Sequence, residues 1–298
     1  MRKAAVLIIF AFAVLAFVGT VVLQSVLILQ RVAAVRDVQG QVSVQARGKD
    51  DFQPLAGRER VYAGDTVKTG ENGHITLEWL DGTRLVVGPK TLMTVLKCQI
   101  NTATDAEMSI FKLDAGSIWI RVIKVLSHKS KFEIVTPTAT AGVRGTIFSV
   151  RVASEGETKI SVLEGQVAVS SSGQGEQVAQ NTVATVTGDR TDIQNFDEQE
   201  RLTWNGLRNV AEPILRIKAP PGGYQAKPGE TVAIEGQSEK GASVTVNGQP
   251  VELQIKQRFS ADVMVPGDFA EPEMTVTVKA VDARGYEALR EAQVKVVR

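Results

Sequence analysis

The chain has 298 residues, 43% of them hydrophobic and 22% charged, and its 34 basic and 33 acidic residues give a formal net charge of +1. This balance excludes a polybasic nucleic-acid-binding protein and an acidic disordered chain, and the length predicts about two folded domains. Because Cys98 is the only cysteine, the sequence also excludes an intrachain disulfide.

The N-terminal segment is strongly apolar. Two basic residues precede residues 4–23, in which only Gly19 and Thr20 are neither aliphatic nor aromatic. A helix of this length extends about 30 Å, the thickness of the hydrocarbon core of a bilayer. The sequence therefore predicts a transmembrane helix that serves as an uncleaved signal anchor within residues 1–30. A cleaved signal peptide is the alternative, although its apolar region is usually shorter.

The charges beside this segment predict its orientation. Arg2 and Lys3 favour a cytoplasmic N-terminus under the positive-inside rule. Arg31 and Arg36 weaken the asymmetry without reversing it. We therefore expect a single-pass membrane protein whose chain lies outside the cytoplasm from about residue 31 onward.

Short alternating stretches separated by glycine occupy residues 35–186. Residues 75–80 (ITLEWL) alternate in polarity, and residues 81–83 (DGT) predict a turn into the next strand. No helical period of comparable length interrupts these stretches. The pattern predicts an all-β domain over residues 31–188.

One short pattern recurs in this domain: GQVSV at residues 40–44, GQVAV at 165–169 and, more loosely, GSIWI at 116–120. In each copy a glycine that can turn the backbone precedes a strand with one apolar face. An irregular β-solenoid or roll would explain the recurrence. Coincidence among strands rich in glycine and valine explains it nearly as well.

Several ordered motifs resemble the FecR-type domain of bacterial envelope proteins. They are GDTVKTG at residues 64–70, DGTRL at 81–85, FEIVTPTA at 132–139, AGVRGTIF at 141–148 and VLEGQV at 162–167. The resemblance covers residues about 35–186. It implies a β-rich, solenoid-like module on the periplasmic side of the bacterial inner membrane.

FecR-like proteins are known as transmembrane regulators that bind a sigma factor with a cytoplasmic segment and receive a signal from an outer-membrane receptor. Only about three residues precede the predicted span here, whereas an isolated helix needs about 12–15 residues to be even marginally stable. Direct sigma-factor binding is therefore not expected. We instead expect an envelope protein or glycan as the partner, because the sequence combines a predicted anchor with two β modules and contains no catalytic constellation.

Apolar residues recur at helical spacing after this domain. Ile193, Phe196, Leu207 and Val210 would share one face of a helix. The spacing predicts a single linker helix over residues 189–212.

Residues 213–298 again show patterns typical of short strands, now separated by different turn residues. Pro-Gly, Asn-Gly and Arg-Gly pairs separate about seven short strands, and Asn247-Gly248 predicts a two-residue type I′ turn. This pattern predicts a small antiparallel β-sandwich. Residues 244–248 and 278–285 also resemble the Ig-like modules of bacterial surface and carbohydrate-active proteins.

The sequence contains none of the common metal-binding, phosphate-binding or nucleophile motifs. Neither His74 nor His128 lies in a zinc-binding motif, and no phosphate loop or nucleophile elbow is present. Glu133 and Glu164 could pair as hydrolase acids, although solvent-facing carboxylates are common on strands. Cys98 could be a reactive thiol or a lipidation point, but a small buried side chain is more typical of such a residue.

Polar residues within the FecR-like motifs have both a functional and a structural interpretation. They could form a contact surface, but turn chemistry accounts for each residue type; the residues are Asp81, Arg144 and Thr146. Three tryptophans could stack on sugars, and core burial is expected for the first two; these are Trp79, Trp119 and Trp204.

The sequence assigns no catalytic, cofactor-binding or metal-binding residue, and no cofactor is expected. It predicts a non-enzymatic, membrane-anchored scaffold or sensor protein that does not bind nucleic acid. Two alternatives remain: an accessory component of transmembrane signalling, and a non-catalytic glycan-binding subunit of a carbohydrate-active system.

Overall fold

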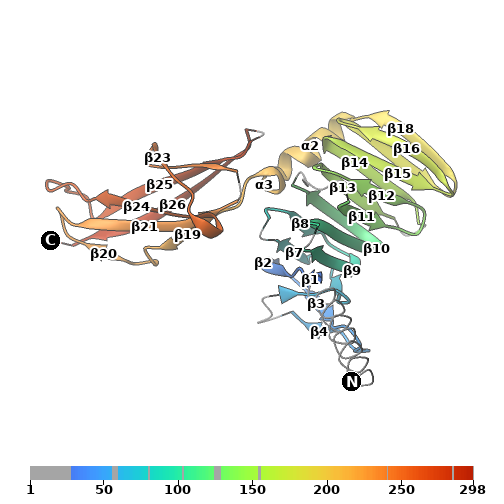
Figure 1. Ribbon diagram of the computed structural model, residues 1–298, viewed down its shortest axis with the longest axis horizontal. Helices are drawn as coiled ribbons and strands as arrows, with labels where there is room; N and C mark the ends of the chain where they lie inside the picture. The colour runs from blue at the N-terminus through green and yellow to red at the C-terminus, as the bar shows by residue number, and fades with distance from the viewer. Residues whose placement is uncertain are drawn as a thin grey trace, which may run out of the picture. The chain divides into compact units, whose positions relative to one another are not determined.

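The computed structural model describes residues 28–297, apart from residues 56–59, 80, 103, 124–128, 154–155, 240 and 284. The chain divides into two compact units (Figure 1). The first unit comprises the residues up to Trp79 together with Arg84–Gln199, and the second comprises Leu80–Thr83 and Glu200–Arg298. Strands account for most of the regular structure in both units.

The first unit consists of two sheets that share one long strand, β10 (Ala106–Arg121), in a closed arrangement. The other strands of the first sheet are β1 (Ile28–Gln30), β3 (Val42–Gln45), β4 (Gln53–Pro54), β6 (Thr66–Thr69), β9 (Leu92–Asn101), β11 (Lys131–Val135), β12 (Thr140–Val143), β15 (Gln166–Ser171) and β16 (Gln174–Ala179). Those of the second sheet are β2 (Ala33–Gln39), β5 (Arg60–Val61), β7 (His74–Glu78), β8 (Arg84–Val87), β13 (Ile147–Val152), β14 (Thr158–Glu164), β17 (Thr182–Thr187) and β18 (Arg190–Asn195).

Strand β10 passes from the first sheet to the second at Gly116. Its first part pairs with β9 and β11, and from Gly116 onward it pairs with β13 and then β8. Gly116 has a φ of +90°, and a Cβ atom there would lie 2.2 Å from Thr91 Oγ1. Any other residue would strain the backbone at this φ, and its Cβ atom would clash with Thr91. The bend therefore requires glycine.

Apolar side chains at alternating positions fill the space between the two sheets. Phe111 and Ile134 point inward from the first sheet and Ile120 from the second, and all three are fully buried. Trp79 packs edge-on against Phe111, with ring centroids 5.7 Å apart. Trp79 belongs to this core, as predicted. Trp119 is also buried, as expected, but it alternates with the core residues Ile118 and Ile120 and lies outside the core cluster.

The recurring glycine motif marks crossings between the sheets. Gly40, Gly116 and Gly165 all have a positive φ, and each lies where the chain leaves one sheet for the other. The stacked turns of a solenoid would pair strands in parallel, but among the described pairings of this unit only that of β10 with β11 is parallel. The nearly all-antiparallel pairing therefore does not fit a solenoid of stacked parallel turns.

The structure corrects the predicted end of the N-terminal helical segment, which the sequence placed at residue 30. Residues 28–30 form strand β1, which pairs with residues 99–101 of β9. The expected transmembrane helix at residues 4–23 lies outside the described residues. Within the described part of the chain, no helix is long and apolar enough to cross a membrane.

The predicted linker helix over residues 189–212 is also wrong. Strand β18 occupies its beginning, and α2 (Glu198–Gly206) and α3 (Arg208–Ala211) follow as two short helices. Ile193 forms a cross-strand pair with Ala184, so its spacing reflects a strand rather than a helical turn. The spacing of the apolar residues fits a helix, but residues 190–195 form a strand because they pair with β17 through backbone hydrogen bonds.

The second unit contains a three-stranded and a five-stranded sheet around its own apolar core. Its strands are β19 (Leu215–Ala219), β20 (Gln225–Ala226), β21 (Thr231–Ser238), β22 (Ser243–Val246), β23 (Gln249–Val251), β24 (Arg258–Met264), β25 (Glu273–Val281) and β26 (Glu287–Val296), with a 3-10 turn η1 (Ile255–Gln257). Asn247 and Gly248 both have positive φ between the paired strands β22 and β23, which confirms the predicted turn. Since β20 runs parallel to β26, the unit is not purely antiparallel, and its Ig-like resemblance stays a prediction.

Candidate functional site

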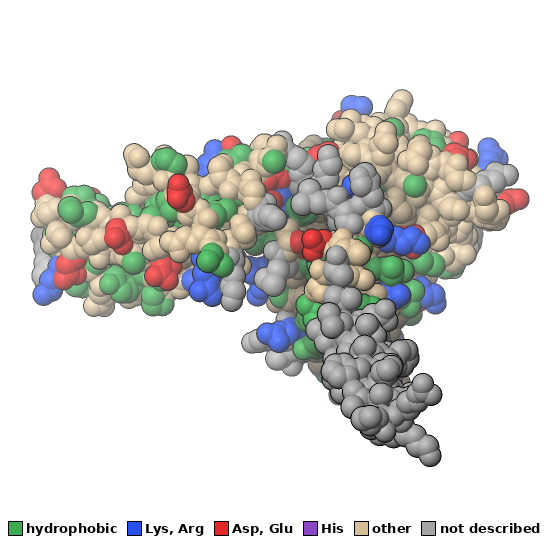
Figure 2. All heavy atoms as spheres, in the orientation of Figure 1, with side chains coloured by type: hydrophobic (Ala, Val, Ile, Leu, Met, Phe, Trp, Pro, Cys, Tyr) green, Lys and Arg blue, Asp and Glu red, His purple; other side chains and the backbone are tan. Residues whose placement is uncertain are grey.

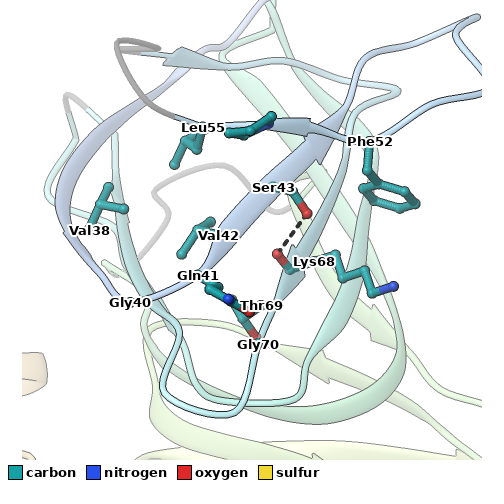
Figure 3. Close-up of a pocket in the computed structure, with 11 residues that line it drawn as sticks. Val38, Gly40, Gln41, Val42, Ser43, Phe52, Leu55, Lys68, Thr69 and Gly70 are labelled. Carbon is teal, nitrogen blue, oxygen red and sulfur yellow. Dashed lines mark hydrogen bonds between the residues drawn. The ribbon is translucent and has the colours of Figure 1, made fainter.

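Two neighbouring hollows lie over β3, β6 and β9 of the first unit, with volumes of about 580 and 590 Å³. They share four lining residues, Phe52, Lys68, Thr69 and Gly70. Figure 3 shows the first hollow with its lining side chains. We call the two hollows together the Phe52–Lys68 groove.

The pairing of β3 with β6 places polar side chains along this groove. Ser43 pairs with Lys68, while Val44 pairs with Val67 and both valines are buried in the core. The Ser43 hydroxyl donates a hydrogen bond to the Lys68 carbonyl oxygen at 3.4 Å (Figure 3). The alternation of a strand therefore presents Ser43 and Lys68 on the face away from the core.

Phe52 and Lys68 form the middle of the groove. The Lys68 ammonium lies 5.5 Å from the centroid of the Phe52 ring, a cation–π contact worth about 0.5–1 kcal/mol at an exposed site. Phe52 is 37% exposed. Among the described residues, the Lys68 ammonium has no carboxylate partner, so its hydrogen-bonding capacity is available to a ligand.

Paired charges and hydroxyl groups line the second hollow. Lys90 Nζ lies 2.9 Å from Glu71 Oε1, and the hydrogen bond and positive charge of Lys90 lower the pKa of the Glu71 carboxyl. The hydroxyls of Thr66 and Thr94 lie 2.9 Å apart, and both residues line this hollow. This part of the groove is therefore polar but balanced in charge.

The GDTVKTG motif shapes the ends of the groove from within. The buried Asp65 carboxylate accepts hydrogen bonds from the backbone N–H groups of Arg47 at 3.1 Å and Tyr62 at 2.9 Å. The Gly70 N–H donates to the Gln41 carbonyl oxygen at 2.8 Å. These contacts hold three loops at fixed positions, so the motif residues have structural roles beside the groove.

The backbone approaches closely at the loops beside the first hollow. A Cβ atom at Gly40 would lie 2.2 Å from the Asn72 carbonyl oxygen, and one at Gly73 would lie 2.2 Å from the Gln41 carbonyl oxygen. Only glycine permits this contact between the loops before β3 and before β7.

The structure explains two of the polar residues that the sequence singled out. Asp81 accepts hydrogen bonds from the backbone N–H of Thr83 at 3.1 Å and from its hydroxyl at 2.9 Å. Thr146 is fully buried and donates to the Gln166 carbonyl oxygen at 3.0 Å. Turn chemistry accounts for Asp81, as predicted. The bond of Thr146 joins residues 20 positions apart in the sequence and is a long-range structural contact, and Arg144 is exposed.

The candidate acids of the hydrolase alternative lie in different sheets. Glu133 is on β11 of the first sheet and forms a 2.7 Å ion pair with Lys131. Glu164 ends β14 of the second sheet. The two carboxylates therefore belong to strands of different sheets.

Cys98 and His74 are parts of the framework. Cys98 is 1% exposed, and the Trp79 indole N–H donates to its sulfur at 3.1 Å, which confirms the expected small buried side chain. His74 lies on β7 beside Gln39 of β2. His128 is outside the described residues, and within the described part of the chain no group of three or more metal-ligating side chains is found.

The groove was not predicted from the sequence. Its central pair joins a residue of the polar loop before β4 to a residue of the GDTVKTG motif. The only signal was alternation within residues 66–69, which places Lys68 opposite to the buried Val67. Nothing local indicates that Phe52 lies beside it.

Residues 65–168 match the FecR protein family and form a FecR domain. The resemblance of the sequence motifs is thus confirmed over this range, which is about a third of the chain. No curated protein matches the chain.

Solved structures with some similarity to the chain include a candidate anti-sigma factor from Parabacteroides distasonis, with 20% identity and a TM-score of 0.38. The match covers 47% of this chain and 63% of that one, so it spans less than two thirds of that protein. Fibronectin(III)-like modules of Clostridium thermocellum CbhA show 14% identity and a TM-score of 0.21 over 62% of this chain and 87% of theirs. Structural similarities with such low sequence identity and TM-scores support no conclusion about function.

Proposed function

We propose that this chain is a non-enzymatic binding protein of the bacterial cell envelope, in which the Phe52–Lys68 groove holds an envelope partner as part of a signalling-related role. The observation that carries this proposal is the position of the FecR domain. Residues 65–168 include the groove residues Lys68, Glu71 and Lys90. The domain thus supplies most of the polar wall of the second hollow.

Rigidity of the groove supports recognition rather than catalysis. Its loops are held by Asp65 and by close contacts at Gly40 and Gly73. Two of the titratable groups on its wall, Lys90 and Glu71, neutralise each other in an ion pair. Such a surface can orient a ligand but contains no activated nucleophile or poised acid–base pair.

An envelope location is part of this proposal. The FecR match and the apolar composition of residues 4–23 support it. Protease added to spheroplasts of the native host should digest the chain, while a cytoplasmic marker stays intact. Survival of the full-length chain in intact spheroplasts would contradict the location.

A photo-crosslinking experiment tests the binding role. The full chain carrying p-benzoylphenylalanine in place of Phe52 should form a discrete adduct in living cells, because this ring lies in the middle of the groove. The matched control places the same group at Tyr224, which is 39% exposed and lies in the second unit. Absence of an adduct at Phe52, or the same adducts at both positions, would reject the groove as the binding surface.

The signalling part has its own readout. Deletion of the gene should change the transcript profile under envelope stress, and a chain with Lys68→Glu should fail to restore it despite normal abundance. An unchanged profile in the deletion strain would leave a binding protein without a signalling role.

A further inference from the structure

We propose that the ligand class of the Phe52–Lys68 groove is an extended, uncharged glycan chain. This inference rests on the proposed binding function and adds the chemistry of the partner. The argument depends on what the walls, the floor and the exposed apolar side chains of the groove can recognise.

The charges on the groove favour an uncharged ligand. The lining residues include two cationic side chains, Lys68 and Lys90, and two acidic ones, Glu71 and Asp114. Glu71 is ion-paired with Lys90, and Asp114 with Lys112 at 2.7 Å. Among the described lining residues this leaves Lys68 as the one charged side chain without an oppositely charged partner, and a single cation does not provide the row of positive charges that would complement a polyanion.

Acidic and basic side chains are also interspersed elsewhere on the chain. On the face drawn in Figure 2, neither sign gathers into a large patch among the described residues. Electrostatic steering of a strongly charged polymer therefore has no evident basis on that face.

The floor of the groove excludes recognition of a peptide by strand addition. Strand β3 lies between β4 and β6, and β6 lies between β3 and β9. The backbone groups of both floor strands are thus used within the sheet. The neighbouring edge strand β4 is only Gln53–Pro54, and proline at an edge removes a donor for pairing.

The apolar content of the groove is too small for an amphipathic helix. Among the described lining residues, only two large apolar side chains are exposed to solvent: Val38 is 43% exposed and Phe52 is 37% exposed. A helix docking in a groove uses a row of apolar anchors at i, i+3, i+4 and i+7. Two exposed apolar side chains do not provide the matching surface.

The remaining features match a sugar chain. The Phe52 side chain, which is 37% exposed, can pack against the C–H face of a hexose. The Lys68 ammonium, which lies over the same ring, can donate up to three hydrogen bonds to hydroxyls. Thr66 and Thr94 share one hydrogen bond, which leaves one hydroxyl hydrogen and several lone pairs for the ligand. Hydrogen-bonding groups thus flank an aromatic platform.

The dimensions favour a chain over a single sugar. The two hollows have volumes of about 580 and 590 Å³. Both volumes lie within the range of about 300–1,000 Å³ that is typical of small-molecule sites. Since they share four lining residues, a ligand could extend from one hollow to the next past Phe52. An oligosaccharide can place consecutive sugars in this way.

Binding of defined oligosaccharides to the purified full-length chain in detergent tests the proposal. The probes are hexamers of β-1,4-linked glucose and of β-1,4-linked N-acetylglucosamine, with a galacturonate hexamer as the anionic comparison. We expect at least one neutral hexamer to bind more tightly than the anionic one, with little change between 50 and 300 mM salt. Phe52→Ala should weaken binding about tenfold, whereas Phe52→Tyr and the distant control Tyr224→Ala should retain it.

Three results would overturn the glycan proposal: no binding of either neutral hexamer, equal binding by Phe52→Ala, or preferential, salt-sensitive binding of the anionic hexamer. A protein adduct at Phe52 in cells combined with any of these results would reject the glycan and keep the proposed binding function. Absence of any adduct at Phe52 together with hexamer binding in vitro would instead reject the cellular function and keep the ligand chemistry.

Discussion

Thr136 and Thr158 share a hydrogen bond of 2.9 Å between their side-chain hydroxyls, and this bond ties the turn after β11 in the first sheet to β14 in the second. Thr158 Oγ1 also lies 2.8 Å from Thr138 Oγ1. Both Thr136 and Thr158 are buried. The TPTAT motif therefore contributes a polar link between two sheets whose other contacts are largely apolar.

Loss of this link should destabilise the first unit. Thr158→Val keeps the shape of the side chain but leaves the Thr136 hydroxyl without one partner, at a cost of about 1–3 kcal/mol. Urea unfolding followed by tryptophan fluorescence measures the change. Thr140→Val on the outer side of β12 is the control, because Thr140 is only partly buried, and it should change stability by no more than about 0.5 kcal/mol.

The bend in β10 should not tolerate a side chain. Gly116→Ala introduces a Cβ atom 2.5 Å from the Thr91 Cα at a φ of +90°, and backbone strain of this kind costs about 1–3 kcal/mol before any clash is counted. We expect a lower midpoint of thermal unfolding. Gly175→Ala is the matched control, since no atom lies within 4 Å of its added Cβ; equal midpoints for the two variants would contradict this account of the bend.

A buried ion pair on the second sheet predicts a large effect of charge removal. Glu78 Oε1 lies 3.0 Å from both Nε and Nη2 of Arg84, and Arg36 Nε lies 3.3 Å from Glu78 Oε2. Arg84 also pairs across the strands with the fully buried Arg121. Because Glu78→Gln would leave buried arginine charge uncompensated, we expect a loss of about 3–5 kcal/mol in unfolding free energy.

Glu133→Gln provides the comparison for that measurement. Its partner Lys131 has a side chain that is 55% exposed, so water screens the pair and the loss should not exceed about 1 kcal/mol. Similar losses for the two variants would show that burial does not set the strength of these pairs.

The Glu71–Lys90 pair predicts a titration change at the groove. Lys90 lowers the pKa of the Glu71 carboxyl, so Lys90→Met should raise it towards the ordinary value of about 4.3. Because the folded-state pKa is the lower one, the contribution of this pair is present above the unfolded value and is lost as pH falls through the folded value. Carboxyl-detected NMR titration measures the shift, and Lys131→Met should leave Glu71 unchanged.

Local sequence patterns determined much of the strand content and several turns. Alternation placed Leu77 and Leu85 in the core, and Asn247-Gly248 formed the expected hairpin turn. The buried Trp79 and Trp119 followed from their apolar area. These features depend on neighbours in the sequence, so periodicity and turn chemistry are sufficient to predict them.

Tertiary pairing decided the features that local patterns could not. Ile193 and Phe196 fit a helical spacing, but β17 provides a hydrogen-bonded partner that makes residues 190–195 a strand. Strand β10 crosses between the sheets where Thr91 packs directly against Gly116. The sequence motif at Gly116 does not show that Thr91 lies there. The Phe52–Lys68 groove likewise arises from strands and loops that are distant in sequence, because the register of β3, β6 and β9 brings them together. The sequence by itself therefore determined most of the strand-forming segments and the motifs that mark a FecR domain. Only the long-range register of the sheets decided that residues 190–195 form a strand, where the strands cross between sheets and which side chains share the groove.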